Sequence, residues 1–136
     1  MLFEMLTGDF LFDPKKQENI PKSEDQLALM MELLNTFPKN YTLVGTNTRK
    51  YINQHGLLKH FDPKLRFMTL KNILIRNHSV KVEEAQALAD FLMPMLEIYP
   101  EKRASAFEML QHPWLKRTSQ DFFMTQEEID DFNNSK

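Results

Sequence analysis

Two carboxylates near the start of the chain have a spacing that could bind a basic ligand. Asp25 and Glu32 are seven residues apart in a segment with helical spacing, so they would share one helix face about 10 Å apart. Asp9 precedes them, directly after Gly8. Carboxylates in a row suit guanidinium groups, which they can bind through two parallel hydrogen bonds. The spacing also fits simpler roles: a favourable charge at a helix start for Asp25, a solvated position for Glu32 and a turn residue for Asp9.

A cation also stands out, because it lies beside a segment suited to burial. Arg103 precedes the short stretch "ASAFEML", which is followed by His-Pro-Trp. An arginine inside a helical core needs a carboxylate partner, since breaking a buried ion pair costs about 3–5 kcal/mol. Glu101 is near in sequence but fits a surface neighbour as well. The alternative is an exposed Arg103 whose aliphatic stem lies on apolar surface.

No set of residues typical of metal binding or nucleophilic catalysis stands out. The chain has no cysteine, which excludes disulfide bonds and thiolate metal sites. Its four histidines show no spacing typical of metal ligands. No carboxylate pair suited to acid–base catalysis, no Ser–His–Asp set and no nucleophile elbow stands out either. His112 and Trp114 are expected to have structural roles at a helix end.

Helices are the elements that would position these side chains. Apolar residues recur at helical intervals, and long strand-like alternation is absent. A first helix over residues 1–6 is expected to end at Gly8. A second is expected over residues 23–37, with Ser23 and Gln26 as a capping box. Its expected apolar stripe consists of Leu27, Met30, Met31, Leu34 and Phe37.

The remainder of the chain contains further helical signals. Shorter helices are expected over residues 49–55, ended by Gly56, and over residues 69–76. In the strong helical pattern over residues 82–96, Pro94 predicts a kink or a nearby end. The sequence therefore predicts an all-α protein. Two further capping boxes predict short helices, and they consist of Ser105 with Glu108 and Thr125 with Glu128.

The charge of the 136-residue chain is unevenly distributed around its net value of −2. Residues 1–36 contain seven acids and three bases, residues 37–81 one acid and nine bases, and residues 82–136 eleven acids and five bases. This alternation predicts separate acidic and basic surfaces, or simply solvated helix faces. The apolar N-terminal stretch lacks a basic flank and is shorter than the roughly 20 residues of a membrane span.

The basic segment over residues 37–81 leaves nucleic-acid binding open as an alternative. Aromatic residues are interleaved with its bases, as stacking surfaces would be. The bases are scattered, however, and no known RNA-binding motif occurs. Direct binding of nucleic acid is therefore not expected. The interleaved aromatic residues are Tyr41, Tyr51, Phe61 and Phe67.

Several stretches together resemble one known family. "EKRASAFEMLQHPWL", residues 101–115, resembles the closing motif of the eukaryotic protein kinase fold. "MLFEMLTGDFLFDP" resembles the end of the large central helix of a kinase C-terminal lobe, and "DFLMPMLEIYPEKRAS" its penultimate helix and exit loop. The start of the chain, followed by "SEDQLALMMELL", is most similar to the SR-protein kinases, which phosphorylate serines in arginine–serine repeats.

The resemblance covers residues 1–117 and implies a fold and a partner. The expected fold is the C-terminal portion of a protein kinase domain, from the end of the central helix to the last helix. Residues 118–136 would form an extension with one short helix and a frayed tail. The upstream part of the kinase domain would be missing, and in kinases the residue that matches Arg103 pairs there with a glutamate of the activation segment.

The resemblance also implies a substrate-docking groove. In the SR-protein kinases an acidic groove grips arginine-rich segments away from the catalytic centre, and its acids match Asp9, Asp25 and Glu32. Its basic member matches Arg76, or is lost at Asn77. The implied partners are arginine–serine-rich proteins, and no membrane partner is expected. The implied location is cytoplasmic and nuclear, with a role in regulating mRNA splicing.

The catalytic parts of a kinase do not occur in this sequence. A glycine-rich loop G-x-G-x-x-G, H-R-D and D-F-G are all missing, and "TGDF" at residues 7–10 has the order of the last motif wrong. The chain alone is therefore expected to be inactive and to hold no cofactor or metal. The parent would be a serine/threonine protein kinase that uses ATP and Mg. The alternative is a stand-alone helical interaction module.

Overall fold

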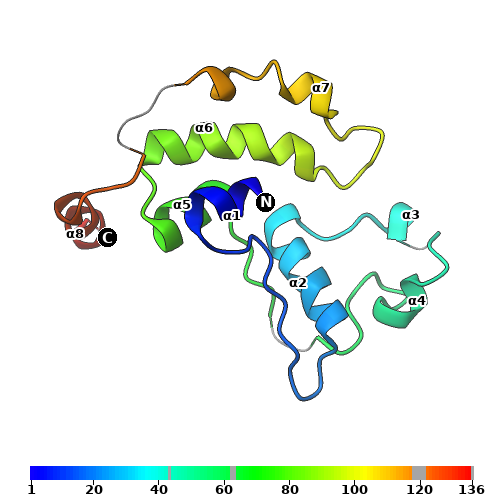
Figure 1. Cartoon of the computed structure of the whole chain (residues 1–136). Helices are drawn as coiled ribbons and strands as arrows, with labels where there is room; N and C mark the ends of the chain where they lie inside the picture. The colour runs from blue at the N-terminus through cyan, green and yellow to red at the C-terminus, as the bar shows by residue number, and fades with distance from the viewer. Residues whose placement is uncertain (43, 62–63, 118–121, 136) are drawn as a thin grey trace. The chain divides into compact units, whose positions relative to one another are not determined.

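A computed structural model describes residues 1–42, 44–61, 64–117 and 122–135. In these ranges the chain forms helices joined by irregular segments and no β-strand (Figure 1). The expectation of an all-α protein is therefore confirmed for the described residues. The chain divides into two compact units, Met1–Phe67 and Met68–Lys136, called unit 1 and unit 2 below. The predicted domain boundary between residues 117 and 118 borders the undescribed residues 118–121 and stays a prediction.

Unit 1 begins with a short helix that ends as the sequence predicts. Helix α1, Leu2–Thr7, is closed by Gly8, which adopts the left-handed conformation with a φ of 81°. The Gly8 N–H donates to the Glu4 carbonyl at 2.8 Å. Glycine suits this position because it has no Cβ to clash in the left-handed region. An irregular segment then leads to Ile20, which is buried.

Helix α2, Lys22–Leu34, has different ends from those expected. The capping box of Ser23 and Gln26 does not form, because Pro21 takes the N-cap position and its carbonyl accepts the first helical N–H groups. The helix stops at Asn35, whose φ of 70° is incompatible with continuation, so Phe37 lies outside it. Of the expected apolar stripe only Met31 is buried; the other buried residues of α2 are Glu24, Asp25, Ala28 and Leu33.

Two one-turn helices follow in unit 1. Helix α3 spans Lys39–Thr42 and helix α4 spans Thr48–Tyr51. The expected helix over residues 49–55 is therefore too long, because the backbone becomes extended at Ile52. Gly56, with a φ of 81°, lies in the turn that follows. Ile52 and Leu58 form an antiparallel bridge across this turn. The result is a small hairpin directly after α4.

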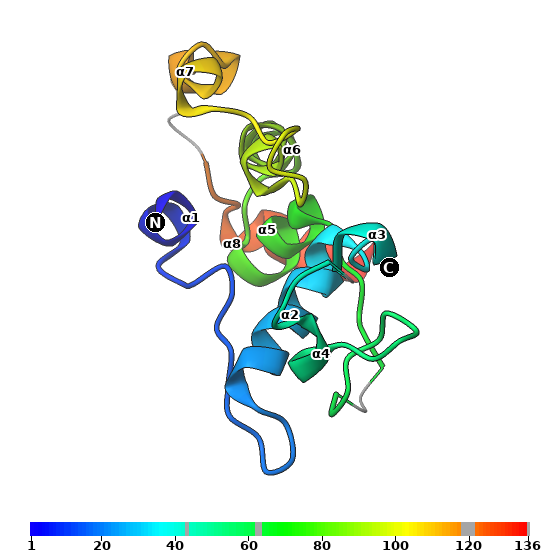
Figure 2. The ribbon, with the colours of Figure 1, turned by 90° about the vertical axis from the view of Figure 1, so that its right-hand side faces the viewer.

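Unit 2 is built around two adjacent helices. Helix α5, Leu70–His78, and helix α6, Val82–Leu92, lie side by side in both Figures 1 and 2. The Thr69 side chain caps α5 by accepting from the Asn72 N–H, so the expected start is confirmed. Apolar burial holds the unit together, and its buried apolar residues are Leu70, Leu74, Ile75, Val80, Ala85, Leu88, Ala89, Phe91, Leu92 and Met109.

The C-terminal elements of unit 2 confirm the break at the proline, the two capping boxes and the role of Trp114. Helix α6 passes into the 3₁₀ helix η1, Met93–Leu96, at the predicted proline. Helix α7, Ala106–Met109, and helix α8, Gln126–Asn134, start with the two expected capping boxes. Between them lies the 3₁₀ helix η2, Pro113–Lys116. Trp114 of η2 stacks on Phe91, with ring centroids 4.8 Å apart, which confirms its anchoring role.

Backbone contacts attach the C-terminal segment to the corner between α5 and α6. The Met124 N–H donates to the Ser79 carbonyl at 2.7 Å, and the Lys81 N–H donates to the Phe122 carbonyl at 3.1 Å. Val80, which is fully buried, and Phe123 form an antiparallel bridge. Within the described ranges, no helix has both the length and the apolar character that a bilayer crossing requires.

Candidate functional site

Asp25 is buried and already engaged within unit 1. Its side chain accepts a hydrogen bond from the Lys15 N–H at 2.8 Å and another from the Gln17 amide at 3.1 Å. Only 7% of the residue is exposed. Asp25 therefore fastens the segment before α2 to the first turn of that helix. An external guanidinium would have to share this carboxylate with two internal donors.

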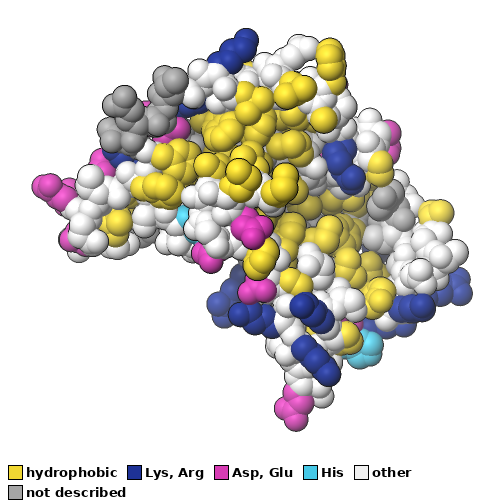
Figure 3. Space-filling view, in the orientation of Figure 1, with side chains coloured by type: hydrophobic (Ala, Val, Ile, Leu, Met, Phe, Trp, Pro, Cys, Tyr) yellow, Lys and Arg dark blue, Asp and Glu magenta, His cyan; other side chains and the backbone are white. Residues whose placement is uncertain are grey.

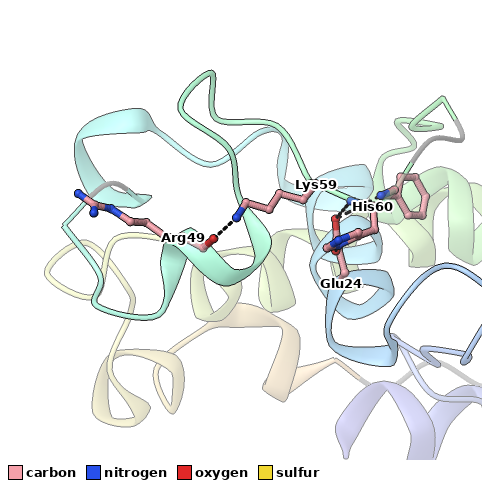
Figure 4. Close-up of polar contacts among 5 residues, drawn as sticks. Glu24, Arg49, Lys59 and His60 are labelled. Atoms are coloured by element: carbon pink, nitrogen blue, oxygen red, sulfur yellow. Dashed lines mark hydrogen bonds and ion pairs between the residues drawn. The ribbon is translucent and has the colours of Figure 1, made fainter.

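Glu24 has the most complete set of contacts of the acids on α2, and sequence reasoning missed it. Its carboxylate is fully buried and accepts from the backbone N–H groups of His60 at 2.5 Å and Phe61 at 3.2 Å. His60 Nδ1 lies 2.8 Å from the other carboxylate oxygen (Figure 4). The contact spans 36 residues, so no local pattern could reveal it. Glu24 anchors the base of the hairpin that follows α4.

Glu32 and Asp9 are more open than Asp25. Glu32, on the last full turn of α2, is half-buried and accepts the Arg66 N–H at 2.7 Å. Asp9 is exposed in the turn after Gly8, and its N–H donates to the Thr7 hydroxyl at 3.3 Å. The three predicted acids thus lie in one compact unit, two of them on one helix. Asp9 and Glu32 are the two with side chains open to solvent.

Arg76 and Asn77, the candidates for the basic member, lie in unit 2. Both are exposed in the last turn of α5. Arg76 borders a cavity of about 230 Å³ between α5 and α8. The other residues that line this cavity are Ile75, Ser79, Met124, Ile129, Phe132 and Asn133. A role of Arg76 in docking stays a prediction.

Arg103 is exposed and bonded to backbone carbonyls. Its Nε donates to the Glu97 carbonyl at 2.8 Å, and one terminal nitrogen lies 3.3 Å from the Ile98 carbonyl. No ion pair joins Arg103 to a carboxylate in the described ranges. These bonds hold the guanidinium against the turn after η1. Its pairing with a glutamate of an activation segment stays a prediction.

The acidic side chains outside α2 are mainly caps and surface pairs. The Ser105 backbone N–H and then its hydroxyl hold the pKa of Glu108 below its ordinary value of 4.5, and Thr125 lowers the pKa of Glu128 in the same way. Glu84 pairs with Arg117 at 2.6 Å. Within the part of the chain that the structure describes, no three His, Asp or Glu side chains converge as metal ligands.

The chain is similar to a group of curated kinases, although no model of a known protein family matches it. It is 42% identical to SRSF protein kinase 3 of Mus musculus over 115 residues, which cover 85% of this chain and 20% of that protein. It is 40% identical to the serine/threonine-protein kinase SKY1 of Saccharomyces cerevisiae over 118 residues, or 87% of this chain and 16% of that protein.

A third relative agrees with these two. Protein kinase dsk1 of Schizosaccharomyces pombe is 39% identical over 123 residues, which cover 90% of this chain and 22% of that protein. The chain spans about a fifth of the length of these relatives. Over most of its length, the chain is therefore similar to segments of serine/threonine protein kinases. Within them, it is most like a segment of the SR-protein kinase family, as the sequence motifs indicated.

Proposed function

We propose that this chain is the C-terminal portion of the large lobe of a kinase that phosphorylates arginine–serine-rich proteins. The identity of about 40% to several SR-protein kinases, over most of the chain, supports this proposal most strongly. The helical architecture and the kinase-like "EKRASAFEMLQHPWL" stretch are consistent with it. Within the parent, the chain contributes substrate binding, and the chemistry occurs elsewhere.

The residues of this chain do not fit an ATP–Mg site. The sequence has no phosphate-covering glycine-rich loop and neither of the kinase motifs that supply metal-binding Asp and Asn. We therefore assign ATP and Mg binding to another part of the parent, and derive no phosphoryl-transfer step from these residues. The chain alone should transfer no phosphate from ATP to an arginine–serine peptide.

The proposed docking site consists of Asp9 and Glu32, with the buried Asp25 as a third acid. Glu32 is half-buried on α2 and has one internal donor, so it retains capacity to accept from a guanidinium. Asp9 is exposed in the turn before α2. Asp25 adds negative charge but is committed to Lys15 and Gln17. Binding should be cumulative over several arginines and should weaken with salt.

Titration with an unphosphorylated arginine–serine peptide tests this proposal. Glu32→Gln should weaken binding about fivefold, because one charge-assisted contact is lost at a partly exposed site. Glu18→Gln is the matched control, since Glu18 is an exposed acid of the same unit outside the proposed site. Equal affinity of wild type and the Asp9→Asn/Glu32→Gln double variant would reject docking at these residues. It would leave the stand-alone interaction module as the alternative.

A further inference from the structure

A basic hollow in unit 1 has no role in the docking proposal. It has a volume of about 670 Å³ and lies beside α4 and the hairpin that follows it. The hairpin is well ordered by backbone bonds: the Lys59 N–H donates to the Tyr51 carbonyl at 2.9 Å, and the Asn53 N–H to the Leu57 carbonyl at 2.8 Å. The residues that line the hollow are Thr48, Arg49, Ile52, Asn53, Gln54, His55 and Lys59.

Among the described residues, the charge around this hollow is positive. Residues 38–61 contain four Lys or Arg residues and no Asp or Glu. Arg49 and Lys59 are exposed, and neither forms an ion pair with a carboxylate in the described ranges. Figure 3 shows Lys and Arg side chains along this edge, in the region of α4 in Figure 1. Unpaired cations around a concave surface favour an anionic ligand.

The hairpin beside the hollow is also anchored to α2. Glu24 binds the backbone at His60 and Phe61, directly after Lys59, and so fixes the base of the hairpin (Figure 4). The Lys59 ammonium group contacts the Arg49 carbonyl, while the Arg49 guanidinium extends away from it. An anion between the two side chains would replace the carbonyl contact of Lys59 and draw the guanidinium inward.

We propose that this hollow binds the phosphate group of a phosphoserine side chain in a peptide. A phosphate monoester carries a charge of about −1.5 to −2 at pH 7 and three strong acceptor oxygens, which suit arginine, lysine and the polar Thr48 and Gln54. Among the described residues, no Phe, Tyr or Trp lines the hollow for base stacking, which disfavours nucleic acid. The source of the ligand rests on the proposed function, because phosphorylation of arginine–serine segments produces phosphoserine.

The test is a titration of the full 136-residue chain with a phosphoserine peptide that contains no arginine. This peptide should bind, and its unphosphorylated form should not. The Arg49→Gln/Lys59→Gln double variant should weaken binding at least tenfold, since it removes two charge-assisted contacts. Lys50→Gln is the matched control: Lys50 is an exposed base of the same helix that does not line the hollow. It should change the affinity less than about twofold.

Three outcomes would overturn this proposal. They are unchanged affinity in the double variant, an equal loss with Lys50→Gln, and tighter binding of an oligouridine with the same number of phosphates. Circular dichroism of each variant checks that the fold is retained. The unphosphorylated arginine–serine peptide is titrated in parallel, because its binding depends on Asp9 and Glu32. If the wild-type chain binds the phosphoserine peptide but not the arginine–serine peptide, only the docking proposal is refuted. If it binds the arginine–serine peptide but not the phosphoserine peptide, only the phosphoserine proposal is refuted.

Discussion

Units 1 and 2 are stabilised in different ways. In unit 1, carboxylates on α2 hold irregular segments by accepting their N–H groups, as Glu24 does for His60 and Phe61 and Asp25 does for Lys15. In unit 2, apolar side chains of α5 and α6 pack together, and short helices are capped locally. When an apolar side chain is shortened, the stability lost depends on the buried atoms removed and on the cavity left behind. When one partner of a buried hydrogen bond is removed, the other partner is left unsatisfied.

The largest effect should come from the apolar part of unit 2. Leu88 of α6 is fully buried. Leu88→Ala should lower the free energy of unfolding by about 3–4 kcal/mol, through lost burial and the cavity left behind. Urea unfolding measures this loss, and hydrogen exchange should show it in α5 and α6. Val82→Ala, at an exposed position of the same helix, is the control. A loss below about 1 kcal/mol would show that this region is not tightly packed.

The next effect should come from the Glu24 anchor of unit 1. Glu24→Gln should lower the free energy of unfolding by about 2–3 kcal/mol. The backbone N–H groups of His60 and Phe61 would lose a charged acceptor and keep only a weaker, neutral one. Hydrogen exchange at the amides of residues 59–61 should accelerate more than exchange anywhere in unit 2. Equal acceleration of exchange in both units would contradict the view that buried carboxylates stabilise unit 1 and apolar packing stabilises unit 2.

A smaller effect is expected for Asp25. Asp25→Asn keeps an acceptor oxygen but loses the charge, so it should lower the free energy of unfolding by about 1.5 kcal/mol. Because Asp25 holds the backbone at Lys15, the segment before α2 should become easier to cleave there with trypsin. Limited proteolysis followed by mass spectrometry measures the rate. Cleavage at Lys15 no faster than in wild type would show that the contact does not restrain this segment.

The local caps of unit 2 should contribute less. Thr125→Ala removes the N-cap of α8 and should cost about 1 kcal/mol, as N-cap replacements typically do. Amide exchange in the first turn of α8 should rise while α5 stays unchanged. Thr125→Ser retains the cap hydroxyl and should behave like wild type. Equal exchange in the alanine and serine variants would exclude a contribution from the hydroxyl.

The smallest effect should be a dependence of the caps on pH. The folded-state pKa of Glu108 lies below its ordinary value of 4.5, so its contribution is present above that value and is lost as the pH falls through the folded pKa. Side-chain NMR titration should show this lowered pKa for Glu108 and for Glu128. Ser105→Ala should return the pKa of Glu108 toward the ordinary value and leave that of Glu128 unchanged.

The contrast between local and long-range contacts explains which features could be predicted from the sequence. The capping boxes at Ser105 and Thr125 were predicted correctly because all their atoms lie within four residues. The capping box predicted at Ser23 was wrong, since Pro21 supplies a fixed φ and an accepting carbonyl two residues earlier. The end of α2 depends on a positive φ at Asn35, which the sequence prediction did not include.

Two of the three predicted acids could be placed on one helix, but the contacts that they form could not be foreseen. Asp25 and Glu32 share α2 as expected. Glu24 lies next to Asp25 and has an ordinary place in the sequence, yet it receives donors from 36 and 37 residues away. Such contacts depend on how the segment around His60 packs against α2 in the folded protein. Periodicity reports which face of a helix is apolar, and it contains no information about which distant N–H groups a carboxylate will meet.

The pairing of Phe123 with Val80 affects how the protein should be cut or fused for laboratory use. A recombinant boundary placed before Phe122 would remove the acceptor for the Lys81 N–H and the donor to the Ser79 carbonyl, and would uncover Val80. An affinity tag joined there would begin at an opened corner between α5 and α6. A tag attached after Ser135 leaves these contacts intact and is the better choice for crystallisation or labelling.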